Sequence, residues 1–503
     1  MASAAVKIHF LNACYHHHNC NYDVNKMKIE SIDINKTLEE ARGLLASDKN
    51  ISPAIRAVME VLFLIITLLM NRFNLNSKNS SKPPSDDPNR DKKSKKNETG
   101  KNPGGQNGHI GKNLQPVENP DEITVIPIDK RTLPKGKYRD AGYDARQVID
   151  LRISRFVIEY RAQILEDQNG NQFVAPFPAY VTRPVQYGQD LKAHSVYLSQ
   201  FQLLPYNRIN DYFSKEINIP VSSGSIFNFN KEAYNLLDKF DEIAKLKLIA
   251  ATVMHVDETG INVNGKNAWI HLAANELWTY FFPHKKRGGI AMNEIGILPF
   301  FKGTLIHDHW KPYFIYQCIH ALCNAHHLRE LQRAYEQDNQ KLALAMKVLL
   351  IEINKTTKDA GGSLPENIAN EYCKKYRAII ADGEIECPQP EAKQIIDGKK
   401  KRGRIKKSKA RNLLERLASF EKDTLRFMED VDVPFTNNLA ENNIRMTKVQ
   451  QKISGCFRSM EGAYIFCRIR SYISTCRKQG MSITTALKML FKGEMPDFMR
   501  ENT

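Results

Sequence analysis

Three acidic residues in the second half of the chain have neighbours that suit them to metal chemistry. Asp257 and Asp308 each follow an apolar, strand-like run, and Glu441 lies in the helix-like segment TNNLAENNIRMTKVQQKISG. Carboxylate oxygens are hard ligands that suit Mg²⁺ or Mn²⁺. Two such cations, about 4 Å apart, activate the attacking oxygen and stabilise the leaving oxygen in phosphodiester chemistry. The predicted cofactors are therefore two divalent cations, Mg or Mn, held by three carboxylates.

Each predicted ligand has neighbours that offer a rival interpretation. Glu258 could bind a cation in place of Asp257. Successive side chains on a strand point to opposite faces, however, so only one of the two faces the cations, and Asp257 is favoured. The same alternation sends His307 and His309, on either side of Asp308, to the other face. We therefore expect these two histidines to pack or to form local hydrogen bonds.

A basic stripe follows the third acid. Arg445, Lys448 and Lys452 lie four, seven and eleven residues after Glu441, which places them along one face of a helix. A carboxylate beside such a stripe suits a metal ligand next to a DNA backbone, although surface ion pairing gives the same pattern. With Arg458 further along, these residues are the predicted DNA-binding set.

The segment HALCNAHH, which follows Asp308, has the residue types of a zinc site. On a helix, Cys323 and His326 fall on one face, whereas a full tetrahedral set with His320 and His327 is doubtful. We expect Cys323 and His326 to be accessory residues that support the active site or pack beside it.

The elements that must position these residues follow the order strand, strand, strand, helix, strand and distant helix. IAATVMHVDETGINV predicts a buried strand ending at Asp257–Gly260, NAWIHLAA and LWTYFFP predict the next two, and GTLIHDHW predicts a later strand. This is the order of an RNase H-like α/β core, predicted over residues 246–460. A helical insertion is expected at about 315–430, where the basic run from Lys399 to Leu417 is a candidate DNA contact, and a helical tail at 461–503.

The first part of the chain predicts a helical segment and a linker. Residues 1–26 read as a possible non-native extension, with translation starting at Met27. Residues 27–75 predict a helical segment that is buried or oligomerising, and its ten-residue apolar run is too short to span a membrane. Residues 76–120 form a low-complexity linker, poor in apolar residues. The linker lysines that could lie along phosphates are Lys92, Lys93, Lys95, Lys96 and Lys101.

Two smaller modules are expected between the linker and the core. Residues 121–190 contain β-branched stretches, EITVIPI and RFVIEYRAQIL, and predict a small β-rich module. Residues 191–245 predict a helix, a turn at Asn218–Val221 and a second helix capped by Ser222 or Ser223. This pattern fits a DNA-binding helix-turn-helix and also an ordinary α-hairpin.

Composition agrees with a nucleic-acid partner without proving one. The 73 Lys and Arg residues exceed the 56 Asp and Glu residues, giving a formal net charge of +17. Such a charge favours polyanionic partners, although other soluble basic proteins share it. Nine cysteines in 503 residues do not form the pattern of a disulfide framework, which indicates a reducing cytoplasm.

Several strings in the sequence resemble the insertion sequence 66 family of transposases. They are NSKNSSKPPSDD, GGQNGHIGK, HVDETG, GTLIHDHW, HALCNAHHLREL and NNLAENNIRMTKVQQKISGCFRS. The resemblance implies a bacterial DDE transposase with an RNase H-like fold, in which Asp257, Asp308 and Glu441 match the catalytic acids. It also implies element-end and target DNA as substrates, a homo-oligomer, accessory proteins from the same element, and a cytoplasmic, nucleoid-associated location without a membrane.

The resemblance implies a reaction and also has one departure. Water would attack the phosphodiester at the element end, and the liberated 3′-hydroxyl would attack target DNA, without a covalent protein intermediate. Many relatives have a cysteine zinc module after the Gly-rich stretch, but this chain has no cysteine between Cys20 and Cys318, so that module lacks its zinc ligands. Two alternatives remain: a decayed copy that only binds DNA, which the intact acids oppose, and a resolvase-like nuclease that cuts without joining.

Overall fold

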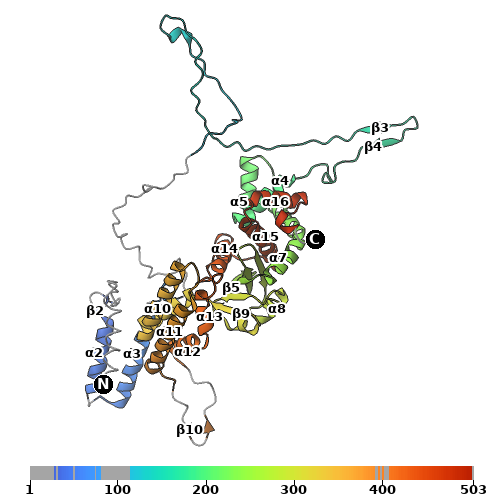
Figure 1. The fold of residues 1–503 in the computed structure, drawn as a ribbon. Helices are drawn as coiled ribbons and strands as arrows, with labels where there is room; N and C mark the ends of the chain where they lie inside the picture. The colour runs from blue at the N-terminus through green and yellow to red at the C-terminus, as the bar shows by residue number, and fades with distance from the viewer. Residues whose placement is uncertain are drawn as a thin grey trace. The chain divides into compact units, whose positions relative to one another are not determined.

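A computed structural model of the chain describes residues 28–29, 32–48, 51–73, 75–80, 114–390, 395–396, 399–400 and 407–500 (Figure 1). The expected N-terminal extension at 1–26 and the linker lysines between 92 and 101 lie outside the described residues. The chain divides into two compact units. As far as they are described, the first contains Met1–Arg90 and Lys239–Gly480, and the second contains Asp91–Asp238 and Met481–Thr503.

A five-stranded mixed sheet forms the centre of the first unit. Its strands are β5 (Val253–Val263), β6 (Lys266–Ala274), β7 (Thr279–His284), β8 (Thr304–His307) and β9 (Ile319–Leu322). The order is β7-β6-β5-β8-β9, in which β7, β6 and β5 pair antiparallel, whereas β5, β8 and β9 pair parallel. The expected mixed α/β class and the four predicted strands are confirmed.

Two details of the sheet differ from the expectation. β5 does not end at Asp257–Gly260 but continues to Val263. Asn264 and Gly265, with φ of 48° and 79°, then form the tight turn into β6. The strand β9 lies in the segment that was expected to begin the helical insertion. It was missed because four residues are too few to show a period.

Helices flank the sheet and close one of its edges. They are α7 (Asp238–Ile249), α8 (Gly289–Ile295), α14 (Asn438–Ser454) and α15 (Met460–Lys478). The edge strand β7 packs against α15. The backbone N–H groups of Thr279 and Phe281 donate to the hydroxyl oxygens of Thr475 and Ser471 at 3.0 and 2.8 Å. These bonds satisfy edge groups that would otherwise be open to pairing with another chain.

The segment between β9 and α14 is helical, as expected. Its helices are α9 (Asn324–Asp338), α10 (Lys341–Asp359), α11 (Glu366–Glu386), α12 (Lys409–Ser419) and α13 (Glu421–Leu425), with the 3₁₀ turn η5 (Arg426–Met428). They share a core that includes Met346, Leu350, Tyr376 and Leu413. Between α11 and α12, β10 (Ile395–Ile396) pairs with β11 (Lys399–Lys400). Residues 401–406 of the basic run lie outside the described residues.

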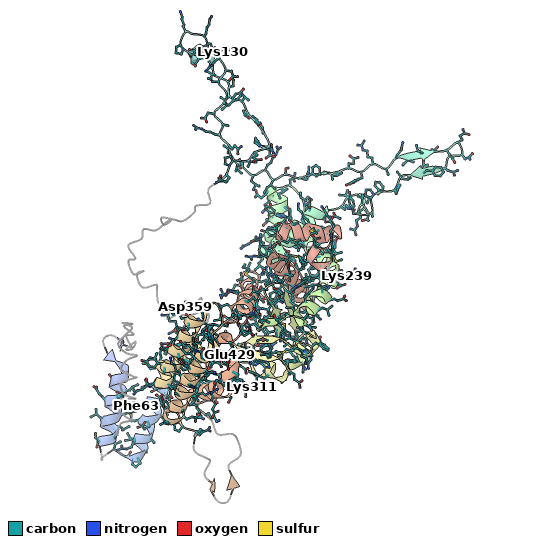
Figure 2. All side chains as sticks on the ribbon, in the orientation of Figure 1. Phe63, Lys130, Lys239, Lys311, Asp359 and Glu429 are labelled. Carbon is teal, nitrogen blue, oxygen red and sulfur yellow. The ribbon has the colours of Figure 1, made fainter. Side chains whose placement is uncertain are left out.

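The N-terminal helices are largely exposed. A short strand pair, β1 (Lys28–Ile29) and β2 (Ile32–Asp33), precedes α2 (Ile34–Ser47) and α3 (Pro53–Phe73). In α3, Phe63 is buried (labelled in Figure 2), whereas Leu62 and Ile65 are exposed. The expectation of a buried helix is therefore wrong for the described residues, and oligomerisation stays a prediction. The 21-residue helix is also longer than the apolar run suggested, and by length and composition alone it could cross a membrane.

The second unit contains a small helical cluster. Its elements are α4 (Gln189–Val196), the π-helical turn η2 (Tyr197–Phe201), α5 (Tyr206–Asp211), the π-helical turn η3 (Tyr212–Glu216), α6 (Ser223–Leu236), α16 (Ile483–Lys492) and the 3₁₀ turn η6 (Asp497–Met499). The Ser222 side chain caps α6 by accepting the N–H of Ser225 at 3.0 Å. The predicted pair of helices is confirmed, with the cap at Ser222, and its DNA-binding role stays a prediction.

Residues 121–190 contain much less sheet than expected. The structure has one hairpin in this range, β3 (Ile164–Glu166) paired with β4 (Gln172–Val174), together with the 3₁₀ turn η1 (Lys130–Thr132). Ile126 and Phe156 are more than 80% exposed. A strand needs a packed face for stability, and no such face forms among the described residues of this segment. The β-rich interpretation is therefore wrong beyond the hairpin.

Candidate active site

Asp257 lies near the middle of β5, where its carboxylate is mostly buried. The carboxylate accepts the backbone N–H of Glu258 at 2.8 Å. Burial, and then the negative charges of Glu258, Asp308 and Glu441, raise the pKa of Asp257 to about 8. The charges of the other two predicted ligands therefore act on Asp257, and such an accumulation of negative charge favours a bound cation.

Asp308 is brought beside Asp257 by the register of two parallel strands. His255 on β5 lies level with Ile306 on β8, so continuing both strands by two residues sets Asp308 level with Asp257. The Asp308 carboxylate accepts the backbone N–H of Trp310 at 3.1 Å. Between these residues, His309 has φ of 71°, so the chain turns directly after the acid. This turn fixes Asp308 at the end of its strand.

Glu441 lies in the first turn of α14, and Asn437 anchors that end of the helix. The Asn437 side-chain oxygen bonds to Nδ1 of His255 at 2.8 Å, and its Nδ2 donates to the carbonyl of Val256 at 2.8 Å. Asn437 is 2% exposed. Because both contacts are to β5 immediately before Asp257, this buried amide sets the position of Glu441 relative to the first acid.

Cys323 and His326 lie beside Glu441, but not on one helix as expected. Cys323 follows β9 and occupies the N-cap position of α9, and His326 lies in the first turn. The Cys323 Sγ is 3.7 Å and the His326 Nδ1 is 3.9 Å from Oε1 of Glu441. On the other side of the carboxylate, Nη2 of Arg329 is 3.8 Å from Oε2. The pair therefore contacts the third acid.

Three other histidines of the region bond to local groups, whereas the ring of His309 packs against that of Phe420, with centroids 4.5 Å apart. His320 Nδ1 lies 3.1 Å from Nε2 of His307, and His327 Nδ1 lies 3.0 Å from Oδ1 of Asn324. Burial lowers the pKa of His307 well below its usual value and lowers that of His327 to about 3. Neutral, locally bonded rings agree with a packing role.

Glu258 belongs to a cluster that sequence reasoning missed. Its carboxylate accepts hydrogen bonds from Arg287 and from the hydroxyl of Tyr313. The Arg287 guanidinium also stacks on two tryptophan rings, 4.7 Å from the centroid of Trp269 and 3.9 Å from that of Trp310. Glu258 is therefore held by partners within the protein, which favours Asp257 as the metal ligand, and this assignment stays a prediction. Alternation along β5 predicts that the Glu258 side chain points away from that of Asp257, but it does not predict Arg287 and Tyr313 as its partners.

The predicted DNA-binding residues of α14 differ in their surroundings. Arg445 and Lys452 are exposed. Lys448 is also exposed, but its Nζ donates to the backbone carbonyl of Gly260, and burial of part of the side chain lowers its pKa. Arg458 lies beyond the end of the helix and is exposed. The structure therefore gathers three of the four on one helix.

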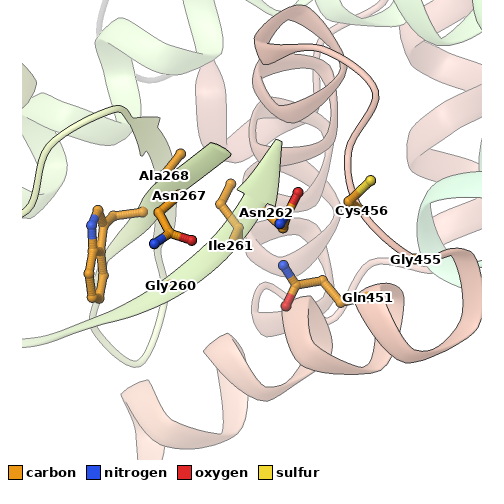
Figure 3. A pocket seen from close by; sticks show the side chains of 9 residues that line it. Gly260, Ile261, Asn262, Asn267, Ala268, Gln451, Gly455 and Cys456 are labelled. Atoms are coloured by element: carbon orange, nitrogen blue, oxygen red, sulfur yellow. The ribbon is translucent and has the colours of Figure 1, made fainter. Parts of the chain in front are cut away.

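An open pocket of about 580 Å³ lies further along β5. Figure 3 shows Asn262 and Asn267 of the β5–β6 hairpin facing Gln451 and Cys456 across it. Its lining contains no acidic side chain, so the pocket is separate from the candidate metal ligands.

The donors fit a pair of hard cations. Asp257 on β5, Asp308 directly after β8 and Glu441 on α14 offer carboxylate oxygens from rigid elements or their ends. The raised pKa of Asp257 is the observation in favour: burial raises it most and the neighbouring acids add to it, and a nearby cation would offset the repulsion from those acids.

Comparison with known proteins adds two family matches. A family model described as "Transposase IS66 family" matches residues 184–465, more than half of the chain. A second, described as "Family of unknown function (DUF6444)", matches residues 30–115. No protein with a curated description matches the chain.

Proposed function

This chain belongs to the IS66 family of transposases, and we propose that it cuts DNA at the ends of its insertion element and joins those ends to target DNA. The observation that carries this proposal is that the charges of Asp308 and Glu441, which arrive from distant parts of the sequence, act on Asp257. The sheet order β7-β6-β5-β8-β9 supports an RNase H-like core around them. We propose that this DDE core occupies residues 246–460.

Asp257, Asp308 and Glu441 would hold two Mg²⁺ or Mn²⁺ ions. Such ions supply the positive charge that activates an attacking oxygen and stabilises a leaving oxygen. The protein supplies the geometry. Asn437 fixes the start of α14 against β5, and Arg329 lies against one oxygen of Glu441, so the third carboxylate keeps its orientation while DNA binds.

The basic side chains after Glu441 would hold the DNA backbone. Arg445 and Arg458 are exposed and would contact phosphates, as would Lys452 on the same helix as Arg445. Lys448 donates to the protein backbone and would contribute less. The helix pair of the second unit and the helical insertion are further proposed DNA contacts. Element-end and target DNA are the proposed partners, with a homo-oligomer and accessory proteins of the same element.

A strand-transfer assay tests the proposal. A labelled element-end oligonucleotide is incubated with Mg²⁺ or Mn²⁺, any accessory proteins, and wild type or Asp257→Asn, Asp308→Asn or Glu441→Gln. Each substitution is expected to lower joining by about 10⁴-fold, the loss typical of an essential catalytic group, while DNA binding persists. Asp359→Asn, an exposed acid at the end of α10, is the matched control and keeps activity.

Three results would contradict parts of this proposal. Substituted proteins that join DNA as well as wild type would show that the acids are wrongly assigned. Wild-type protein that binds element ends without cutting would indicate a decayed DNA-binding copy. Cutting without joining would indicate a nuclease of the resolvase kind.

A further inference from the structure

One carboxylate oxygen of Glu441 lies beside the sulfur of Cys323 and a ring nitrogen of His326. The ligand atoms of Cys323, His326 and Glu441 all lie within 4.8 Å of one another. Cys323 is 1% exposed, whereas the side chains of His326 and Glu441 are 26% and 24% exposed, so solvent reaches the group through the latter two. Among the described residues, no other group of three or more His, Cys, Asp or Glu side chains has ligand atoms this close together.

The spacing fits one tetrahedral ion. With bonds of about 2.3 Å to sulfur and about 2.1 Å to nitrogen and oxygen, neighbouring ligands of a tetrahedral zinc lie roughly 3.4–3.6 Å apart. The measured separations from Oε1 of Glu441 are 3.7 Å to Sγ of Cys323 and 3.9 Å to Nδ1 of His326. The remaining separation, from the Cys323 sulfur to the His326 nitrogen, is within 4.8 Å, so side-chain movements of up to about 1 Å would complete three of four positions.

One of the three atoms lacks a hydrogen-bond partner. Nδ1 of His326 is buried and accepts or donates no hydrogen bond within the described part of the chain. Sγ of Cys323 accepts the backbone N–H of Asn437 at 3.1 Å, a bond that orients sulfur without using all its lone pairs. Burial raises the pKa of the Cys323 thiol to about 11, so a cation that binds the sulfur must displace its proton.

We infer that Cys323, His326 and Glu441 form a second cation site, selective for ions of the zinc class, that shares Glu441 with the carboxylate site. Thiolate and imidazole are the ligands that distinguish such ions from Mg²⁺ and Mn²⁺, which take oxygen ligands. An ion bound to one thiolate and one carboxylate adds no net positive charge, so Arg329 beside Oε2 is compatible with it.

If the proposed function holds, the sharing of Glu441 makes zinc an inhibitor of strand transfer. Zinc at this site binds the carboxylate oxygen that faces Cys323, and so withdraws Glu441 from the pair of hard cations. Inhibition by zinc then depends on Cys323, which is not one of the three proposed catalytic acids. Removal of zinc restores joining.

Binding is tested with Co²⁺, which replaces zinc in thiolate sites and gives a sulfur-to-metal absorption band. The full-length protein is titrated without accessory proteins or DNA, in a reductant that has no thiol. Wild type is expected to bind one ion with this band, and Cys323→Ala and His326→Asn to weaken binding by more than about 100-fold, since loss of a direct ligand exceeds the loss from an outer partner. Cys456→Ala, an exposed cysteine outside the group, is the matched control and keeps the band. Circular dichroism checks that each variant is folded.

Zinc inhibition is tested separately in the strand-transfer assay. The zinc concentration for half inhibition, measured relative to each protein's own activity without zinc, is expected to rise by more than about 100-fold in Cys323→Ala. Equal zinc sensitivity in the two proteins would overturn the shared-ligand inference, and a Co²⁺ band unchanged in both Cys323→Ala and His326→Asn would overturn the site itself. If wild type fails to join DNA at all, the proposed function fails, while the Co²⁺ titration still decides whether the site exists.

Discussion

Asp257 and Glu258 are adjacent carboxylates on one strand, and burial raises the pKa of both, yet their hydrogen-bond partners differ. Glu258 is almost fully buried, and Arg287 and Tyr313 both donate to it. Asp257 accepts one backbone N–H and otherwise faces the charges of other acids. The same contrast separates Lys448, which donates to a backbone carbonyl, from exposed Arg445.

The difference teaches how to tell structural charges from functional ones in this molecule. A charge whose partner is within the protein stabilises the fold and has little left for a ligand. A charge that the protein leaves uncompensated lowers stability and persists where binding requires it. Each side of the comparison can therefore be tested through stability or binding.

The largest effect on stability is expected from the compensated pair. Arg287→Met leaves Glu258 buried with Tyr313 alone, and should lower the free energy of unfolding by about 3–4 kcal/mol. The double substitution Glu258→Gln with Arg287→Met removes the unpaired charge and should recover part of the loss. Chemical denaturation measures both. A single variant as stable as wild type would mean that Glu258 is not a structural charge.

The opposite effect is expected at Asp257 in the absence of divalent cations. Its pKa is raised to about 8 in the folded protein, from about 4 in the unfolded chain, so the folded state binds its proton more tightly. The resulting stabilisation is fully present below about pH 4 and is lost as the pH rises through 8. Asp257→Asn stays neutral.

At pH 8, Asp257→Asn should therefore be more stable than wild type by about 2 kcal/mol, because water reaching the carboxylate lessens the nominal effect. Denaturation in a chelator from pH 5 to pH 8.5 measures the difference, which should shrink as the pH falls and when Mg²⁺ is added. A pH-independent difference would show that Asp257 ionises normally.

The smallest effect distinguishes the two basic residues. Arg445→Ala should reduce the slope of log K against log salt for DNA binding by about 1, the value of one lost phosphate contact. Lys448→Ala is the matched comparison and should reduce it less, since its ammonium group donates to Gly260. Equal slopes for the two variants would remove the distinction between compensated and available charges.

The sequence predicted the features that depend on neighbouring residues, and missed those that depend on contacts between distant ones. Apolar runs located β5, β6, β7 and β8, and alternation predicts that the side chains of Asp257 and Glu258 point in opposite directions. The meeting of Asp257 with Asp308 depends on a parallel register that no local pattern contains. The Glu258–Arg287 pair joins residues 29 positions apart, and neither residue indicates the other in the sequence.

The failures have physical causes of the same kind. β-branched stretches in 121–163 predicted strands, but strands form only where another surface covers them, and these side chains are exposed. The apolar face of α3 was expected to be buried or oligomerising. Apolar side chains favour contact with another surface, but the sequence does not show where that surface is. The Cys323–His326 pair was expected on one helix because a four-residue strand leaves no period to detect.

The contact between Asn437 and His255 also determines when, during synthesis, the candidate site can be completed. These residues are 182 positions apart, and the last acid follows the amide on α14. A ribosome adds about 5–20 residues per second, so a growing chain that already contains Asp257 and Asp308 waits roughly 10 s for Glu441. During that interval the nascent protein has neither the third carboxylate nor the amide that positions it. The proposed cutting chemistry would therefore be withheld until α14 has been made.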